Sequence, residues 1–363
     1  MNAEFWRGKR VLVTGHTGFK GSWLALWLNS LSAEVIGYAL APPTQPNLFS
    51  LANVSNGIHS IDGDILDLAH LRGVIREHQP EIVFHLAAQS LVRQSYRDPI
   101  GTIATNVMGT ANLLEAVRDV PSVKSIVVVT TDKCYKNQEQ QNAFRESDPL
   151  GGDNPYSCSK AAAEFVTDAY RRSFFAGGKQ VTVVGVATAR AGNVIGGGDW
   201  AADRLVPDVV RSFGDDKELL IRNPGSVRPW QHVLDPLSGY LLLAEKLFYD
   251  GARYGQSWNF GPAKAEAQPV SAVLDLFGQM WGPGVKWRRD ENIQPHEQYY
   301  LSLDSTKATS QLGWERKWDL KQAMAATVRW YRAYFLKDNL RAVTLQQIRE
   351  YQAAGKPMAT SLT

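Results

Sequence analysis

A glycine loop follows directly on the first apolar run of the chain. Residues 9–14 read Lys-Arg-Val-Leu-Val-Thr, and Gly15-His-Thr-Gly18-Phe-Lys-Gly21 then opens a segment with helical spacing. In a dinucleotide-binding βαβ unit, the first glycine allows a tight turn, the second lets a pyrophosphate approach the backbone, and the third packs helix against strand. The position of the loop therefore predicts a cofactor loop, and the alternative is an ordinary glycine-rich βα turn.

Strand-like and helix-like segments alternate along the first half of the chain. Apolar runs at 34–38, 81–86, 125–130 and 181–187 are separated by stretches of helical character. Strands that are apolar on both faces are typical of buried parallel sheets. We predict an α/β fold in which a doubly wound parallel sheet is followed by a smaller, mixed α/β lobe at the carboxyl end.

The alternation breaks after about residue 190, where glycines, prolines and tryptophans become frequent. We therefore predict a dinucleotide-binding Rossmann-like domain over 1–190, which carries the catalytic residues. A substrate-binding lobe is expected over 191–340, with an amphipathic helix at 319–336 and at least one crossing of the chain back into the main sheet. Residues 341–363 are expected to form a carboxyl-terminal tail whose small, polar end is frayed.

Composition excludes several classes of protein. Among 363 residues, 39 Lys and Arg face 36 Asp and Glu, a net charge of +3 that is too weak to indicate nucleic acid or an anionic membrane. No uncharged apolar run reaches the ~18 residues that a membrane span requires, and the first residues lack a signal-peptide pattern. Cys134 and Cys158 have no CxxC spacing, which fits a reducing compartment. We expect a cytoplasmic enzyme with no nucleic-acid or membrane partner.

The end of the second predicted strand lacks the group that usually identifies the cofactor. A carboxylate roughly 20 residues beyond the loop binds the ribose in many dinucleotide sites, but residues 38–42 read Tyr-Ala-Leu-Ala-Pro. The sequence is compatible with either NAD or NADP as the cofactor, although the lack of a positive charge in this segment favours NAD. Asp64 and Ile65, after a third predicted strand, are placed either to reach the adenine ring or to form an ordinary turn.

A tyrosine and a lysine four residues apart begin a predicted helix. Pro155 suits its first turn, and the spacing places the Tyr156 phenol and the Lys160 ammonium on one helical face. A nearby cation favours the phenolate and lowers the tyrosine pKa, which would let Tyr156 act as a base near neutrality. The pair alone also occurs by chance on exposed helices.

Polar side chains follow the most strongly apolar predicted strand, which ends near Thr130. Ligands bind at the carboxyl ends of the strands in open α/β sheets. Thr131 is suited to hydrogen-bond a sugar hydroxyl and Asp132 to act as a general acid, whereas Lys133 is an unusual neighbour for that carboxylate. The alternative is a solvated turn.

Taken together, these motifs resemble a known family over nearly the whole chain. The glycine loop, the segment His85-Leu-Ala-Ala-Gln89, the Thr131–Asp132 pair and the Tyr156–Lys160 pair are similar to those of extended short-chain dehydrogenase/reductases that act on nucleotide sugars. Within that group, four segments resemble the CDP-glucose 4,6-dehydratases, lyases that form CDP-4-keto-6-deoxyglucose. They are Thr131-Asp-Lys133, Pro42-Pro-Thr-Gln-Pro-Asn-Leu-Phe49, Gly192-Asn-Val-Ile-Gly-Gly-Gly-Asp-Trp200 and Arg228-Pro-Trp-Gln-His-Val233.

The resemblance implies NAD as the cofactor and a net loss of water. Tyr156 would take the 4-hydroxyl proton as C4 is oxidised, a base would then remove the acidic C5 proton, and Asp132 would protonate the leaving 6-hydroxyl. Lys133 stands where most related dehydratases have a glutamate as the C5 base. It is either the base, if burial and nearby charge depress its pKa, or a cation that stabilises the enolate.

The motifs and the resemblance together assign three sets of residues. The catalytic set is Thr131, Asp132, Lys133, Tyr156 and Lys160. The cofactor-binding set is Gly15, Thr17, Gly18, Phe19, Lys20, Gly21, Asp64, Ile65, Leu86, Ala87, Ala88, Gln89, Tyr156 and Lys160. The substrate-binding set is Gln89, Asn193, Arg204, Arg228 and Tyr299, where a single arginine is as readily a solvated surface charge. No metal ligand is expected.

The resemblance further implies a homodimer. Family members commonly pair through the helix that carries the tyrosine motif and through the long helix before it, here about 102–118. Val107, Ala111, Leu114 and Val117 lie at helical spacing along that helix. This apolar stripe of four residues faces either a partner subunit or the sheet of its own chain.

Other functions account for less of the sequence. The seven histidines show no HxxxH or HxH spacing, His85 is expected to pack in a buried strand, and GxSxG is absent. A non-catalytic NAD-binding protein gives no reason for the Thr131–Asp132 and Tyr156–Lys160 pairs. The alternatives that remain share the fold: a sugar-nucleotide 4-epimerase, a net dehydrogenase, or a dehydratase for another nucleotide base.

Overall fold

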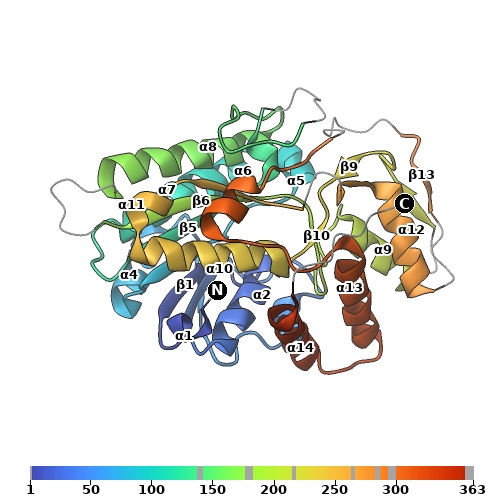
Figure 1. Cartoon of the computed structure of the whole chain (residues 1–363), viewed down its shortest axis with the longest axis horizontal. Helices are drawn as coiled ribbons and strands as arrows, with labels where there is room; N and C mark the ends of the chain where they lie inside the picture. Colours follow the sequence, from blue (N-terminus) through green and yellow to red (C-terminus); the bar gives the residue numbers. More distant parts are fainter. Residues whose placement is uncertain are drawn as a thin grey trace.

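The apolar runs of the sequence form one parallel sheet. In the computed structural model, which describes residues 2–136, 142–175, 183–214, 218–262, 266–282, 287–292 and 300–355, seven strands pair in parallel (Figure 1). Their order is β11 (Ser257–Phe260), β6 (Gly185–Ala191), β5 (Ser125–Val129), β4 (Ile82–His85), β1 (Arg10–Thr14), β2 (Glu34–Ala39) and β3 (His59–Asp62). The predicted doubly wound α/β fold is confirmed, although the strand expected at 181–187 lies at 185–191.

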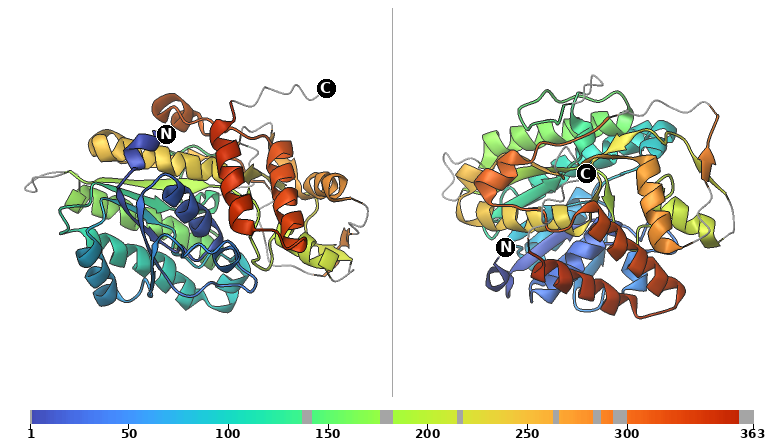
Figure 2. Two further views of the ribbon diagram at one scale, coloured as in Figure 1. Left: turned by 90° about the horizontal axis from the view of Figure 1, so that it is seen from below. Right: turned by 45° about the vertical axis from the view of Figure 1, so that its right-hand side comes forward.

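Helices cover both faces of the sheet because the strands are apolar on both faces (Figure 2). Successive strand side chains point to opposite sides, and Leu12 of β1 joins one hydrophobic core while Val11 and Val13 join the other. The first core includes α4 (Leu68–His78) and α7 (Gly109–Val117). The second includes α2 (Phe19–Ser30) and α10 (Leu234–Tyr249).

Further helices complete these layers and the connections between strands. They are α1 (Ala3–Trp6), α3 (Leu48–Leu51), α5 (Val92–Arg97), α6 (Pro99–Ile103), the π-helical turn η1 (Ala104–Met108), the short turn η2 (Asp132–Cys134), α8 (Pro155–Tyr170), η3 (Arg171–Phe175), α11 (Gly251–Tyr254) and η5 (Ala308–Leu312). The long helix expected at 102–118 is therefore α6, η1 and α7 in succession. Helices α5, α6, η1 and α7 all contact α8.

The segment after β6 forms a smaller lobe beside the carboxyl edge of the sheet (Figure 1). It contains β7 (Val194–Ile195), α9 (Leu205–Gly214), β8 (Leu219–Ile221), β9 (Val227–Arg228), β10 (Gln231–His232), β12 (Gln268–Pro269), α12 (Val270–Trp281), β13 (Trp287–Arg289) and α13 (Leu320–Phe335). β11 returns from this part of the chain to the edge of the main sheet, next to β6. The lobe is thus tied to the sheet by a strand as well as by packing.

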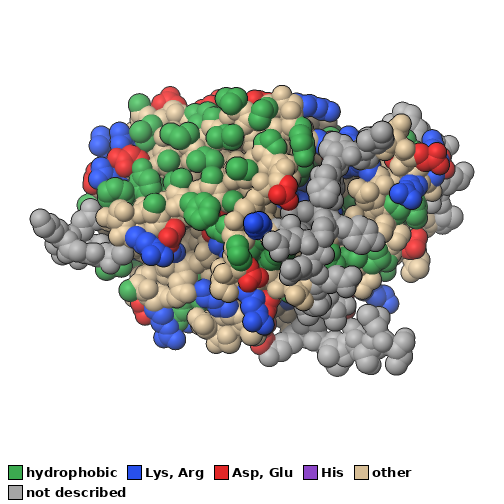
Figure 3. Space-filling view, turned by 90° about the horizontal axis from the view of Figure 1, so that it is seen from above, with side chains coloured by type: hydrophobic (Ala, Val, Ile, Leu, Met, Phe, Trp, Pro, Cys, Tyr) green, Lys and Arg blue, Asp and Glu red, His purple; other side chains and the backbone are tan. Residues whose placement is uncertain are grey.

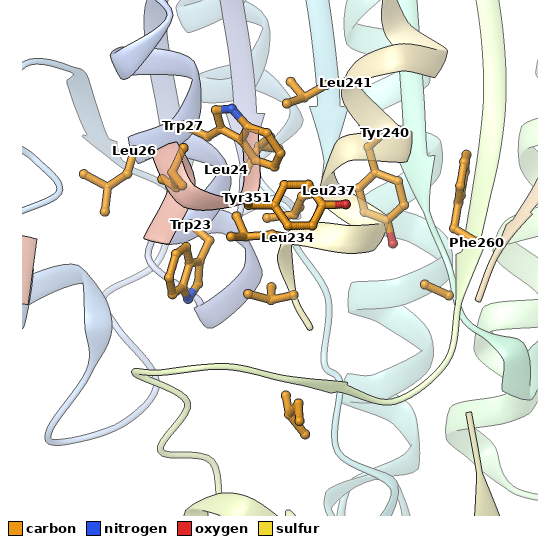
Figure 4. Packing of buried hydrophobic residues seen from close by; sticks show 14 of the residues in the cluster. Trp23, Leu24, Leu26, Trp27, Leu234, Leu237, Tyr240, Leu241, Phe260 and Tyr351 are labelled. Atoms are coloured by element: carbon orange, nitrogen blue, oxygen red, sulfur yellow. The ribbon is translucent and has the colours of Figure 1, made fainter. Parts of the chain in front are cut away.

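The carboxyl-terminal segment differs from the expected tail. Residues 340–353 form α14 (Leu340–Ala353), which packs on α2. Figure 4 shows Tyr351 of α14 among side chains of α2 and α10; its ring lies 5.7 Å from that of Trp27, and its hydroxyl donates to Asp235 at 2.8 Å. The apolar face of α14 was missed because polar residues dominate the segment. No helix in the described ranges is long and apolar enough to cross a membrane.

Candidate active site

A cavity of about 620 Å³ lies at the carboxyl edge of the sheet, where the order of the strands reverses between β1 and β4. Ligands bind at this place in open α/β folds, and the volume is in the range of small-molecule sites. The segments that follow β1 to β6 line one side. Residues of the smaller lobe, from α9, β8 and β9, line the other.

The glycine loop lies in this cavity with its backbone bare. Gly15 has a φ of +76°, and a Cβ there would lie 2.7 Å from the backbone nitrogen of Ala87. A Cβ on Gly21 would lie 2.1 Å from the carbonyl oxygen of Gly15. Because α2 begins at Phe19, its first turn presents backbone amide groups and the positive end of a helix dipole to an anion. These features fit a dinucleotide pyrophosphate.

The remaining predicted cofactor residues surround the loop. Thr17, Phe19, Lys20, Asp64, Ile65, Leu86, Ala87 and Ala88 all line the cavity. The hydroxyl of Tyr38 donates to the carbonyl oxygen of Asp64 at 2.9 Å and so fixes the turn after β3. Ala39, Leu40 and Ala41 line the cavity after β2, where an arginine would otherwise bind a 2′-phosphate.

Gln89 is held away from the cavity. Its side-chain amide donates to Thr102 at 2.8 Å, and its Oε1 accepts from the backbone of Leu91 at 2.5 Å. The cavity is lined by the neighbours Ala88 and Ser90, and of the described residues Gln89 is not among those that line it. The structure thus gives Gln89 a role in holding the loop after β4.

The tyrosine and lysine begin α8, as the sequence predicts. Asn154 caps the helix by accepting from the backbone of Ser157 at 3.0 Å, and Pro155 occupies its first turn. Tyr156 and Lys160 are both buried and line the cavity. Burial lowers the pKa of Lys160 to about 8, with Glu164 opposing the shift.

The pKa of Tyr156 departs from expectation. The sequence predicts a value lowered by the neighbouring cation, whereas burial raises the pKa of Tyr156 to about 12. A hydrogen bond with Thr131 and the charge of Arg204 oppose the shift without overcoming it. Desolvation outweighs the nearby positive charge because the phenol lies in a closed part of the cavity.

The turn after β5 carries a carboxyl group that no partner fully satisfies. Asp132 is 1% exposed; Thr131 donates to its Oδ1 at 3.1 Å, and its Oδ2 has no hydrogen-bond partner within the described part of the chain. Burial raises the pKa of Asp132, against the charges of Lys133, Arg228 and Lys20. A raised pKa favours the protonated carboxyl, which is the form that a general acid needs.

Positive charges gather around this carboxyl group. Lys133 is half-buried and lines the cavity next to Asp132. Lys20 enters from the amino end of α2, where burial and the charge of Arg204 lower its pKa to about 8. Cations around a cavity of this size suit an anionic ligand such as a diphosphate.

The smaller lobe supplies the predicted substrate residues. Asn193, Arg204 and Arg228 line the cavity. Arg204 is ion-paired with Asp199 at 2.8 Å and donates to Ser90 at 3.1 Å. Tyr299 lies outside the described residues.

Sequence reasoning missed the groups that cross the cavity between lobe and sheet. Asp199 and Ser90 hold Arg204, and Asp203 pairs with Arg93 of α5 at 3.5 Å and with Arg222 at 3.6 Å. Asp199 stands in the glycine-rich segment 192–200 that the family resemblance singled out. Nothing in the spacing of the other residues indicates that they meet.

His85 is a core residue, as the sequence predicts. His85 bonds to Thr14 at 2.8 Å and to Thr110 at 3.2 Å, and burial lowers its pKa to about 3. Among the residues that the structure describes, no group of three or more His, Cys, Asp or Glu side chains is placed to hold a metal ion.

A bare glycine loop, a buried Tyr156–Lys160 pair and the Thr131–Asp132 turn around one cavity define a dinucleotide-dependent enzyme of the extended short-chain dehydrogenase/reductase class. The family model described as GDP-mannose 4,6 dehydratase matches residues 12–327. The chain belongs to this family of sugar-nucleotide dehydratases.

Individual relatives agree with this assignment. A CDP-glucose 4,6-dehydratase from Salmonella typhimurium is 49% identical over 98% of this chain and 99% of its own. A dTDP-glucose 4,6-dehydratase structure from Bacillus anthracis, in complex with NAD, has a TM-score of 0.74 at 25% identity and covers 92% of this chain and 100% of its own. The dTDP-glucose 4,6-dehydratase from Streptomyces venezuelae, with NAD and TYD bound, has a TM-score of 0.72 at 26% identity, over 92% and 99% of the two chains.

Proposed function

We propose that this protein converts CDP-glucose to CDP-4-keto-6-deoxyglucose, with NAD as a bound cofactor that each turnover regenerates. The observation that carries the proposal is the meeting of Tyr156, Thr131 and the partly unsatisfied carboxyl of Asp132 at one cavity. A 4-epimerase or a net dehydrogenase has no step that requires a buried acid for a leaving hydroxyl. The CDP-glucose 4,6-dehydratase at 49% identity supports the choice of substrate.

The first half of the reaction needs a base at the 4-hydroxyl of glucose. Tyr156 takes that proton, and the Thr131 hydroxyl beside it opposes the rise in the tyrosine pKa. Lys160 and the glycine loop would hold the cofactor. When bound, NAD accepts the hydride of C4, returns it to C6 and, through its positively charged ring, favours the Tyr156 phenolate.

The second half removes water across C5 and C6. The 4-ketone makes the C5 hydrogen acidic. Lys133, beside Asp132, either removes it as a proton in its neutral form or stays charged and stabilises the enolate that another base forms. Asp132 gives its own proton to the 6-hydroxyl, which leaves as water. The raised pKa of Asp132 keeps that proton available.

The cations of the cavity bind the rest of the substrate. Arg228 is 5% exposed beside the catalytic turn, where its charge acts on Asp132. Arg204 reaches across the cavity to Ser90 and is oriented by Asp199. We assign Arg228, Arg204 and Asn193 to the diphosphate, since guanidinium groups bind phosphate oxygens in bidentate fashion.

The test is a product assay over CDP-, dTDP-, GDP- and UDP-glucose. We expect a 4-keto-6-deoxy sugar from CDP-glucose, identified by mass spectrometry as the loss of one water, with no steady rise in reduced nicotinamide absorbance. Equimolar build-up of reduced cofactor would identify a net dehydrogenase. A product of unchanged mass would identify an epimerase.

Two variants separate the steps of the elimination. Asp132→Asn keeps the shape and removes the acid; C4 oxidation should proceed while water loss falls on the order of 10²–10⁴-fold. Lys133→Met should oxidise substrate yet fail to exchange the C5 hydrogen with deuterated water, measured by NMR of the recovered sugar. Exchange at the parent rate in Lys133→Met would show that another group is the C5 base.

We propose that two copies of the chain pair through the outer face of α5, α6, η1 and α8. Figure 3 shows hydrophobic side chains gathered on this side of the molecule. The exposed apolar residues of these elements and of η3 are Tyr96, Ile100, Ile103, Met108, Phe165 and Phe174. An apolar patch of this kind on one face is self-complementary about a two-fold axis. Leu114 and Val117 of the predicted stripe are buried against their own sheet instead.

A charge placed on this face should separate the subunits. Phe165 is 60% exposed, and Phe165→Glu is expected to give a monomer by light scattering while the parent is a dimer. Leu336, which is 74% exposed at the end of α13, offers a matched control: Leu336→Glu should stay dimeric. A monomeric parent at micromolar concentration would contradict the pairing.

The product suggests the setting of the enzyme. A 4-keto-6-deoxy sugar nucleotide is a precursor for deoxysugars, and we propose a role in supplying such sugars to the O-antigen of lipopolysaccharide. Cys134 and Cys158 are both free. Free thiols suit a reducing compartment, and we place the reaction in the cytoplasm.

A further inference from the structure

The helix that carries Tyr156 and Lys160 also carries a carboxylate that the reaction does not use. Glu164 lies one turn after Lys160 and is 3% exposed. Arg190 of β6, 2% exposed, donates to both of its oxygens, from Nε at 2.9 Å and from Nη2 at 2.8 Å. Such a bidentate ion pair fixes the relative orientation of two groups as well as their distance.

The Glu164–Arg190 pair holds both ends of the catalytic turn. Thr130, directly before the turn, donates to Glu164 Oε1 at 2.5 Å. Tyr135, directly after it, accepts from Arg190 Nη1 at 2.7 Å, and the guanidinium lies 4.8 Å from the centre of the Tyr135 ring. The segment 131–134 is therefore anchored at both sides to one buried ion pair.

The same pair brings the end of β6 against the catalytic acid. Gly192 follows Arg190 by two residues, and a Cβ there would lie 2.9 Å from Oδ2 of Asp132. That oxygen has no hydrogen-bond partner in the described part of the chain, and Oδ1 accepts from the adjacent Thr131. The position of the carboxyl group thus depends on the two segments that enclose it, the turn and the end of β6.

Stability alone is a weak reason for such a pair. Burying two charges costs free energy, and well-packed apolar residues often serve as well. Here both carboxylate oxygens of Glu164 accept further hydrogen bonds, and Thr188 donates to Oε2 at 2.7 Å. The Tyr135 hydroxyl in turn donates to Asn259 Oδ1 at 2.7 Å. A fully satisfied polar network specifies one arrangement of the elements that it joins.

We infer that Glu164 and Arg190 are positioning residues for the elimination of water, because they hold the Thr131–Lys133 turn and the end of β6 in the one arrangement that places the Asp132 carboxyl. The inference rests on the proposed function. C4 oxidation depends on Tyr156 and Lys160, which α8 holds through its own backbone and the Asn154 cap. Glu164 also raises the pKa of Lys160, but burial of Lys160 outweighs that effect. Loss of the pair should therefore affect water loss more than oxidation.

The experiment compares the two steps in single-turnover measurements on the holoenzyme. Glu164→Gln keeps the shape of the side chain and removes its charge. We expect C4 oxidation, read from reduced nicotinamide absorbance, to stay within about threefold of the parent, and water loss to fall on the order of 10²-fold, the usual cost of a misplaced catalytic group. KM should change little, since Glu164 is buried behind the turn.

A milder variant keeps the test decisive if Glu164→Gln does not fold. Thr130→Val removes one link to the turn and leaves the ion pair intact, so that oxidation should persist and water loss should fall several-fold. In the Glu164→Gln/Thr130→Val double variant, the losses in the rate of water elimination should be less than additive, because both substitutions act through the same Thr130–Glu164 contact.

Asp235→Asn is the matched control. Asp235 in α10 is a fully buried carboxylate that accepts from Tyr351 at 2.8 Å and from the backbone of Lys317 at 3.1 Å, away from the cavity. The Asp235→Asn variant should have a lower melting temperature than the parent, while its ratio of oxidation to water loss stays at the parent value.

One outcome would overturn the inference: a ratio of oxidation to water loss that stays at the parent value in Glu164→Gln and Thr130→Val, whether both rates are unchanged or fall by the same factor. Glu164 and Thr130 would then stabilise the fold without positioning Asp132 for the elimination of water. A parent enzyme that forms no 4-keto-6-deoxy product would instead refute the proposed function.

Discussion

Burial of the Asp132 carboxyl, whose Oδ2 has no hydrogen-bond partner among the described residues, is the feature on which the rest of the site depends. A buried carboxyl in this state costs free energy if it is ionised, and burial raises the pKa of Asp132, the direction that suits a proton donor. Lys133, Arg228 and Lys20 oppose that shift and prevent it from growing further. The carboxyl is therefore able both to give its proton to a leaving hydroxyl and to recover it when the cycle ends.

The fold supplies this environment by bringing three strand ends together. The turn after β5 carries Asp132, the end of β6 closes on it through Gly192, and the loop after β1 leaves bare backbone opposite. A side chain at Gly15, Gly21 or Gly192 would collide with neighbouring atoms of the chain that shape the site. The smaller lobe completes the enclosure with Arg204 and Arg228, whose charges suit a diphosphate.

Local motifs allowed much of this site to be predicted from the sequence. The glycine loop, the Tyr156–Lys160 spacing and the polar strand end at Thr131 each have a meaning within a few residues, and the structure places all three around one cavity. Contacts between distant segments could not be read in this way. The Glu164–Arg190 pair joins residues 26 positions apart, and α14 packs on a helix near the other end of the chain.

Two features of the site depend on surroundings that residue spacing does not reveal. A spacing of four residues indicates that Lys160 is near Tyr156, but not how strongly both are desolvated, and burial determines the direction of the tyrosine shift. The position of a residue next to a motif also does not show which hydrogen bonds its side chain makes. Gln89 follows Ala88 at the cavity wall, yet its amide is engaged by Thr102 and Leu91.

In the proposed reaction, one enzyme-bound cycle moves hydrogen from C4 to C6 while water is lost. The most direct measurement is turnover of CDP-glucose that carries deuterium at C4, with the product analysed by NMR and mass spectrometry. Deuterium is expected in the C6 methyl group of a 4-keto product, without loss to solvent. Deuterium retained at C4, or found in released reduced cofactor, would contradict it.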